Sequence, residues 1–397
     1  MLYWIATSVS LFLLARWILG GDPRPVNGVY SLPGTWYPIK YALFRLLMQL
    51  RRRQNASKAE VTSGDGAGYG MRSRSSPGDM DKPQDLSPEH PLAVDAVYFN
   101  GGDRNGTYLV AATARRHNNI VQTILLIRIP DVGLLEFPTL PETNLEGTHP
   151  GEFAAGGLKL EAVEPMKTWK LTFSGKLRLQ RTMELLEVKF SLDWTALTKY
   201  FDFDTDLHPA VMCDAIAREK WSRQFFDTLK RSHQTHYEQF GEITGNIDIE
   251  KHGIRNVKLQ GVRDHSYGNK RDWSSFHRYI LQYAYMEDGT SVCFGAICIP
   301  NLMSRLIVGY VFQPDGRMDA VSSTDFEFYT MGDDGHPPKE FSLNFTAGRD
   351  HYCLKGSQVL APVFFMGTDW DAKIHERMCT FTLNGLPGWG ISEWDYR

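Results

Sequence analysis

The sequence predicts an all-β protein with two antiparallel β-barrels in tandem, an N-terminal membrane helix and a helical connection between the barrels. From residue 92 onward, short apolar runs separated by turn residues recur about every 8–12 residues, which is typical of antiparallel barrels or curved sandwiches. Aromatic residues make up 12% of the chain, which suits sheet surfaces and apolar pockets. A helix-like stretch at residues 209–229 interrupts the strand pattern.

The overall composition excludes several classes of protein. The chain has 397 residues, of which 42% are hydrophobic and 22% charged, so it is not wholly disordered, collagenous or a multi-span membrane protein. A formal charge of -3 gives no overall field for nucleic acid, and we expect no nucleic-acid partner. The five cysteines are scattered without zinc spacing and are expected to be reduced thiols.

The first 20 residues are predicted to be a membrane anchor. The run from Leu2 to Leu19 is almost entirely apolar except for Arg16, and it barely reaches the ~20 residues that a spanning helix needs. The alternative is a helix docked on the protein. Because positive charge follows this segment, the positive-inside rule predicts a single-pass protein with a cytoplasmic body, in the endoplasmic reticulum or another endomembrane.

Residues 21–53 form an amphipathic basic segment in this interpretation. Apolar residues recur at helical spacing between residues 41 and 50, and Arg51, Arg52 and Arg53 follow them. Such a helix suits an anionic membrane surface, but it suits docking on the main body equally well. Residues 54–90 are rich in Ser, Gly, Asp and Pro, which predicts a disordered linker.

The main body is predicted to contain two β units, at residues 92–240 and 241–397. Strand-like runs fill both, and the turns Glu287-Asp288-Gly289 and Pro314-Asp315-Gly316 are good hairpin signals in the second. Residues 193–240 contain the helical connection.

One segment is dense in functional groups: residues 261–273 read GVRDHSYGNKRDW. In an extended strand, Arg263, His265 and Tyr267 face one side, while Asp264 and Ser266 face the other. A buried His held by a carboxylate can transfer a proton near neutral pH. An equally acceptable interpretation is structural, with Arg–Asp ion pairs and a stacked Trp closing a barrel end.

This segment resembles the R-D-H-S-W-G-x-R-D-W signature of the tandem lipocalin-like superfamily. That superfamily includes carotenoid 1,2-hydratases, AttH-like proteins and, more distantly, tocopherol cyclases. The sequences HYEQ at residues 236–239 and GWG at 388–390 support the resemblance, which covers about residues 92–397. Two departures are Tyr267 in place of Trp and an additional residue between Gly268 and Arg271.

The resemblance implies an apolar ligand of isoprenoid or lipid type, in addition to the membrane, as partner. As an enzyme, the protein would be a hydratase, cyclase or isomerase. The expected catalytic residues are Asp264, His265 and Tyr267, the expected pocket residues are Trp273, Tyr283 and Tyr285, and the expected bracing residues are Arg263, Arg271 and Asp272. No nucleotide or metal motif is found, so no cofactor or metal is expected. The alternatives are a non-catalytic carrier of the same ligand and a pure interaction scaffold.

Overall fold

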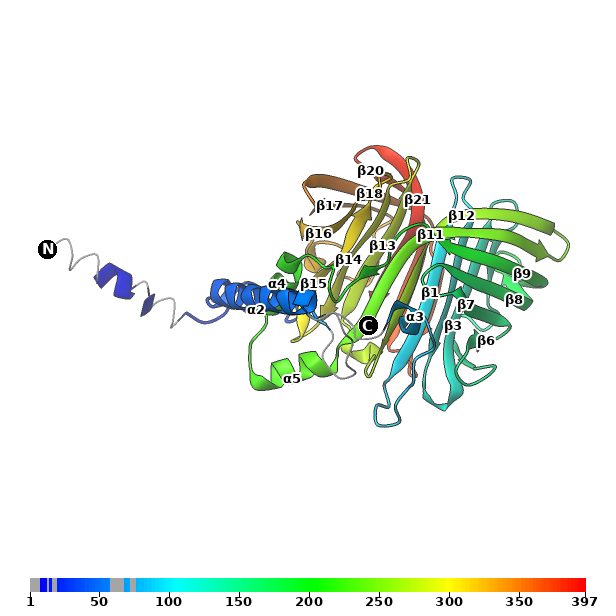
Figure 1. Ribbon diagram of the computed structural model, residues 1–397. Coiled ribbons are helices and arrows are strands. Elements are labelled where there is room, and N and C mark those ends of the chain that lie inside the picture. The colour runs from blue at the N-terminus through cyan, green and yellow to red at the C-terminus, as the bar shows by residue number, and fades with distance from the viewer. Residues whose placement is uncertain (1–7, 13, 16–19, 58–67, 72–75) are drawn as a thin grey trace.

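The computed structural model describes residues 8–12, 14–15, 20–57, 68–71 and 76–397 (Figure 1). Strands dominate and the helices are few, which confirms the predicted all-β fold class. The helices are α2 (Tyr37–Ser57), α3 (Pro77–Met80), α4 (Pro209–Arg218) and α5 (Arg223–Arg231), with short 3-10 turns η1 (His117–Asn119), η2 (Trp273–Ser275) and η3 (Phe328–Thr330).

The strands belong to two sheets. The first holds β1 (Val94–Gly102), β2 (Tyr108–Arg115), β3 (Ile120–Ile129), β4 (Gly133–Glu136), β5 (Asn144–Glu146), β6 (Phe153–Ala155), β7 (Leu158–Glu164), β8 (Thr168–Leu179), β9 (Glu184–Ala196), β10 (Phe201–Asp202), β11 (Gln234–Ile249) and β12 (Gly253–Gly268). The second holds β13 (Arg278–Met286), β14 (Ser291–Ile299), β15 (Met303–Phe312), β16 (Met318–Thr324), β17 (Glu340–Ala347), β18 (Asp350–Leu360), β19 (Val363–Met366), β20 (Ala372–Leu383) and β21 (Leu386–Tyr396).

Each sheet closes into an antiparallel barrel of eight strands. The first ring runs β11-β12-β1-β2-β3-β4-β8-β9, and β9 pairs with β11 to close it. The second runs β13-β14-β15-β16-β17-β18-β20-β21, and β21 returns to β13. Closure pairs the strand edges that an open sheet would expose. The two barrels lie side by side in Figure 1.

The division between the barrels differs from the predicted one at residues 240 and 241. Both β11 and β12 belong to the first barrel, because β12 pairs with β1 and β11 pairs with β9. The second barrel therefore begins at β13, after the dense segment instead of before it. The turn signals near residue 241 are compatible with either division, since they do not reveal which distant strands pair.

Part of the predicted disordered linker is folded against the first barrel. Residues 76–90 include α3, and Asp81 directly after it is fully buried. Its carboxylate forms an ion pair with Arg263 and accepts hydrogen bonds from the Tyr237 hydroxyl (2.6 Å) and the Trp169 indole (3.3 Å). Burial would raise the pKa of Asp81, but Arg263 and the hydrogen bonds outweigh it and hold that pKa below its usual range. The polar composition of residues 54–90 does not reveal this docking, because the docking depends on one buried carboxylate, that of Asp81.

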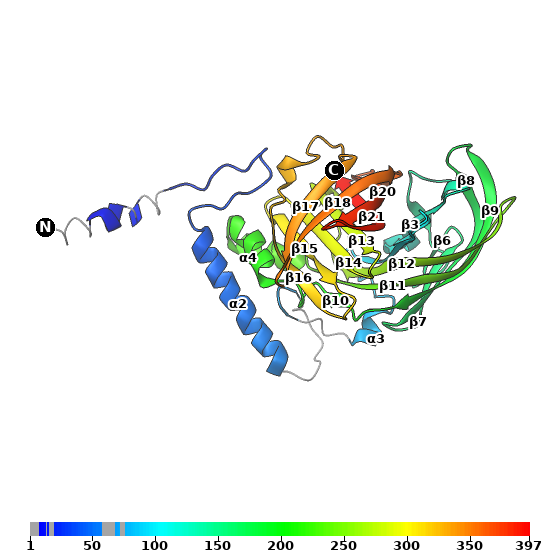
Figure 2. The same ribbon diagram turned by 90° about the horizontal axis from the view of Figure 1, so that it is seen from above.

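The amphipathic segment forms α2, which docks on the main body. This is one of the two alternatives that the sequence predicts. Figure 2 shows α2 at the edge of the molecule beside α4, which in turn packs on β15 and β16. Phe44 and Met48 are buried, and the Tyr37 hydroxyl donates to Asp214 of α4 (2.6 Å). The helices α4 and α5 form within the predicted helical stretch, but they join β10 to β11 inside the first sheet and do not connect the two barrels.

The opposite face of α2 is apolar and exposed. It carries Ile39, Leu43, Leu46, Leu47 and Leu50, and Leu43 and Leu46 are each more than half exposed. The helix has basic residues but no acidic ones. Docking of α2 on the body therefore leaves its apolar face exposed, and this face is the one that contact with a membrane surface would use.

The predicted anchor at residues 1–20 lies mostly outside the described residues. In the part of the chain that the structure describes, no helix combines the length and the apolar character needed to cross a membrane. The membrane location stays a prediction.

The ion pair at Asp81 predicts a large stability effect. Removing one partner of a buried pair leaves an uncompensated charge, so we expect Asp81→Asn to lower the free energy of unfolding by ~3–5 kcal/mol. Urea unfolding followed by circular dichroism measures it. The control is Asp79→Asn, because Asp79 lies two residues earlier in an exposed ion pair with Lys82 and should matter little. Equal stability of both variants and the wild type would show that residues 76–90 do not hold the barrel.

The exposed face of α2 predicts contact with an anionic bilayer. We expect Leu43→Glu/Leu46→Glu to reduce flotation of the full chain with vesicles containing phosphatidylserine, because the variant places acidic groups on the apolar face. Leu185→Glu on β9 is the control, since Leu185 is also about half exposed but lies on the first barrel. Equal flotation of the two variants would show that α2 does not contribute to membrane contact.

Candidate active site

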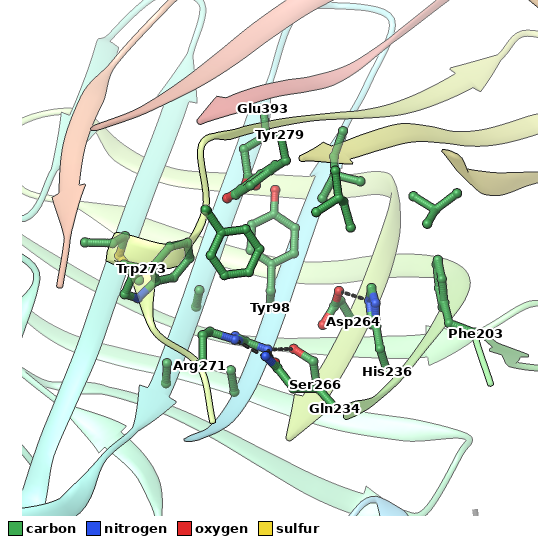
Figure 3. Close-up of a pocket in the computed structure, with 18 of the residues that line it drawn as sticks. Tyr98, Phe203, Gln234, His236, Asp264, Ser266, Arg271, Trp273, Tyr279 and Glu393 are labelled. Carbon is green, nitrogen blue, oxygen red and sulfur yellow. Dashed lines mark hydrogen bonds and ion pairs between the residues drawn. The ribbon is translucent and has the colours of Figure 1, made fainter. Parts of the chain in front are cut away.

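A cavity of about 290 Å³ lies between the two barrels (Figure 3). Its walls are mostly apolar and come from β1, β2 and β3 of the first barrel and from strands of the second, including β13, β15, β20 and β21. Apolar lining residues include Ile124, Phe276, Leu281, Val308, Phe364 and Ile374. The few polar groups that face this space are therefore poorly solvated and can have strongly shifted pKa values.

Two glutamates of the second barrel form an acid pair on one wall. Glu376 of β20 and Glu393 of β21 are directly opposite in the strand register, so both carboxyl groups project to the same side. The Tyr98 hydroxyl donates to Glu376 (2.7 Å), and the Tyr279 hydroxyl donates to Glu393. The pair is thus held by one tyrosine from each barrel.

The acid pair retains a proton at neutral pH. Burial raises the pKa of Glu393 to about 7. Burial, together with the neighbouring carboxylate of Glu393, raises the pKa of Glu376 well above its usual range. Two carboxyl groups this close cannot both ionise cheaply in an apolar cavity. The site can therefore act as a proton donor at neutral pH.

A charged histidine lies on another wall. The His236 Nε2 atom is 2.5 Å from Asp264 and 3.4 Å from Glu238, and Phe203 stacks on the ring with centroids 4.1 Å apart. Burial alone would lower the pKa of His236, but the two carboxylates outweigh it and raise it to about 10. His236 is therefore an imidazolium paired with Asp264.

Among the described residues, His236, Glu238 and Asp264 also form one group of three whose ligand atoms lie within 4.8 Å of one another. Such a group could hold a metal ion. A metal would have to displace the proton of His236, because only the neutral imidazole is a ligand. The raised pKa of His236 works against that exchange.

Arg271 occupies a further part of the cavity wall. It follows β12, and its guanidinium donates to Gln234 (2.6 and 2.8 Å) and to the Ser266 hydroxyl (2.9 Å). Trp273, two residues later in η2, is buried and also lines the cavity. Figure 3 shows Arg271 and Glu393 on different sides of the space, with Tyr98 between them in this view.

The alternation predicted for the dense segment is confirmed. Asp264 and Ser266 line the cavity, while Arg263 and His265 point into the first barrel and are fully buried there. The His265 Nε2 atom lies 2.7 Å from Asp95, and Nδ1 lies 2.9 Å from the Tyr237 hydroxyl. Tyr267 contacts the His265 ring and is not among the residues that line the cavity. Of the three expected catalytic residues, the structure brings only Asp264 to the cavity.

The other predicted residues divide in the same way. Trp273 and Tyr283 line the cavity, and the Tyr283 hydroxyl donates to Glu238 (3.1 Å). Tyr285 lies outside the lining and donates to the Asn100 side chain (2.5 Å). Asp272 caps η2, accepting from the Ser274 amide (3.1 Å), so its role is local.

Comparison with known proteins assigns the chain to a family. The model described as "Family of unknown function (DUF8627)" matches residues 4–396. The chain belongs to this family. No curated protein sequence matches the chain at a significant level.

Solved structures share the architecture. The putative AttH protein from Nitrosomonas europaea matches with a TM-score of 0.50 and 10% sequence identity, over 85% of this chain and 98% of that one. Kievitone hydratase from Nectria haematococca matches with a TM-score of 0.49 and 10% identity, over 85% and 96% of the two chains. The first likeness supports the predicted tandem lipocalin-like fold. At 10% identity it carries nothing about activity.

Sequence reasoning missed the acid pair and its two tyrosines. Glu376 and Glu393 lie far from the dense segment at residues 261–273 and outside its motif. The available signal was a Glu within an apolar strand, Ile391 to Trp394, but the register between β20 and β21 that pairs it with Glu376 is not visible in the sequence.

The acid pair predicts a pH-dependent stability. The folded-state pKa of Glu393 is raised from 4.5 to about 7, so this group stabilises the fold fully below about pH 4.5 and loses that contribution as the pH rises through 7. The difference in unfolding free energy between wild type and Glu393→Gln should therefore fall over this range, by at most ~1.4 kcal/mol per pH unit. Urea unfolding at several pH values measures it. A flat difference would contradict a raised pKa.

Proposed function

We propose that this protein is an acid–base enzyme without a cofactor, a hydratase, cyclase or isomerase that acts on an apolar substrate of isoprenoid or lipid type. The observation that carries the proposal is the Glu376–Glu393 pair, which faces a mostly apolar cavity and is held by the Tyr98 and Tyr279 hydroxyls. Burial raises the pKa of both carboxyl groups. Protonating a carbon–carbon double bond requires a donor that keeps its proton at neutral pH, and exclusion of bulk water from the site favours the protonated carboxyl group. The mostly apolar lining supports the same chemistry.

The proposed reaction begins with proton transfer from the acid pair to one carbon of a double bond. The electron pair of that bond forms the new C–H bond and leaves a cation on the other carbon, while the pair becomes a carboxylate. The rings of Tyr98, Trp273 and Phe276 can stabilise the cation through their faces. Water then adds and returns a proton to the carboxylate, or a neighbouring C–H gives up its proton and the double bond moves.

The remaining charged groups position the site in this proposal. Asp264 holds His236 as an imidazolium, so neither group is the donor. His265, buried against Asp95 and Tyr237, braces the first barrel. The proton-donating role predicted for Asp264 and His265 thus passes to the glutamates, whereas the bracing roles predicted for Arg263 and Asp272 are kept.

The second candidate function is a carrier of the same class of ligand. The mostly apolar lining favours it, because carriage requires an apolar space and no acid. A carrier would leave two carboxyl groups buried without a chemical use, which is costly for the fold. The two candidates differ in whether bound ligand exchanges hydrogen with solvent.

Exchange of hydrogen is the measurement that tests the proposal. We expect the full chain to incorporate deuterium from heavy water at alkene carbons of at least one member of a panel of farnesol, geraniol, geranate and methyl geranate, followed by mass spectrometry. Glu376→Gln should lower the rate ~10²-fold or more, as expected for a lost general acid, and retain ligand binding. The rate should also fall above about pH 7, where Glu393 loses its proton.

The matched control is Glu340→Gln, which makes the same change at an exposed position on the second barrel. It should leave the rate unchanged. Binding of panel members without exchange would favour the carrier. Exchange that survives Glu376→Gln and Glu393→Gln would overturn the assignment of the donor.

A further inference from the structure

Arg271 is a partly buried cation on the cavity wall without a carboxylate partner. Its guanidinium donates only to the neutral oxygens of Gln234 and Ser266, and no carboxylate of the described residues lies within salt-bridge distance of it. Buried charges in proteins are normally paired, because leaving water without a counter-ion is costly. Burial is also the main reason why the pKa of Arg271 is lowered.

The carboxylates elsewhere in the cavity are already committed. Asp264 forms its ion pair with His236 at 2.5 Å, and Asp204 lies 2.7 Å from the His233 ring nitrogen. The acid pair holds a proton at neutral pH, so it contributes little negative charge. The charge of Arg271 is therefore only partly offset.

A second guanidinium adds positive potential at this end of the cavity. Arg116 donates to the backbone oxygen of Arg271 (3.0 Å) and to the Gln122 side chain (3.3 Å), again both neutral. Gln122 lines the cavity beside Trp273. Burial lowers the pKa of Arg116, and Arg271 lowers it further by more than the nearby Asp272 carboxylate raises it, so this end of the cavity stays electropositive and an anion would stabilise it.

We propose that Arg271 binds the carboxylate of the substrate, which is therefore an unsaturated apolar carboxylic acid and not a neutral hydrocarbon or alcohol. Gln234 and Ser266 hold the guanidinium in place, the carboxylate occupies the cationic end, and the apolar body extends past Trp273 and Phe276 toward Glu376 and Glu393. This inference rests on the proposed function for the identity of the substrate. It concerns binding, which can be measured without turnover.

The experiment compares each acid with its own methyl ester, so that only the charge changes. The pairs are geranate with methyl geranate and cinnamate with methyl cinnamate, at about pH 6, where a free carboxylic acid is ionised and Glu393 keeps its proton. Binding to the full chain is followed by isothermal titration calorimetry. For at least one pair we expect the acid to bind tenfold or more tightly than the ester.

Variants locate the effect. Arg271→Gln should abolish the preference for the acid, and Arg271→Lys should keep part of it, because a point charge replaces the planar fork. Lys270→Gln is the matched control: it removes the same charge one residue away, from a side chain that lines a neighbouring surface pocket and not this cavity. It should keep the full preference.

The proposal is overturned if no acid binds more tightly than its ester, or if Arg271→Gln keeps the preference; Arg271 would then be a structural strut between Gln234 and Ser266. Should Arg271→Gln fail to fold, the wild-type comparison and Arg271→Lys decide. Glu376→Gln separates the two proposals. If Glu376→Gln loses hydrogen exchange but still binds the acid more tightly than the ester, the two proposals are independent. If the wild type fails to exchange hydrogen, only the proposed function is refuted. If the wild type exchanges hydrogen but does not prefer the acid, only the present inference is refuted.

Discussion

Arg263 lies inside the first barrel with its guanidinium about 5 Å from the rings of Trp169, Trp194 and Tyr237. A cation in such a place requires a counter-charge, and Asp81 supplies it from outside the barrel sequence. The position of Asp81, the orientation of Tyr237, whose hydroxyl donates to Asp81, and the contact of that hydroxyl with His265 Nδ1 are linked to this pair. Because Arg263 is on β12, the same pair also fixes the strand whose other face presents Asp264 and Ser266 to the cavity.

One face of β12 thus points into the first barrel, and the other faces the cavity. The interface between the barrels is likewise built from side chains of both barrels. Hydroxyl groups of Tyr98 and Tyr283 each reach across to a glutamate of the other barrel. The polar groups of the cavity are consequently held by contacts from both sides. Such a site needs no mobile loop to position its acid, since each carboxyl group is on a strand and is oriented by a tyrosine.

Local pattern was enough to predict the class of fold and the two faces of β12, because alternation along a strand depends only on neighbouring residues. It also located the helices at residues 209–231, although these join strands of the first sheet and do not connect the barrels. It could not show that Asp81 pairs with Arg263, that β11 and β12 close the first barrel, or that Glu376 faces Glu393, because each depends on which distant segments meet. Composition was misleading for residues 76–90, where one buried carboxylate outweighs a polar neighbourhood. His265 was expected at the reaction centre because the motif is dense there, yet the pleat of the strand points it into the barrel.

The order of strands in the first ring has a consequence for how the chain matures. Its strands β1 and β12 are paired although they are far apart in the sequence, since Val94 is opposite Gly268. Arg263, the partner of Asp81, likewise follows it by 182 residues. When only β1 to β9 have been synthesised, the sheet therefore has two open edges, and Asp81 lacks its partner Arg263. Such edges are prone to pairing with other chains. The strand edges of the first ring therefore stay unpaired until Gly268 has emerged, although the finished ring has no open edge.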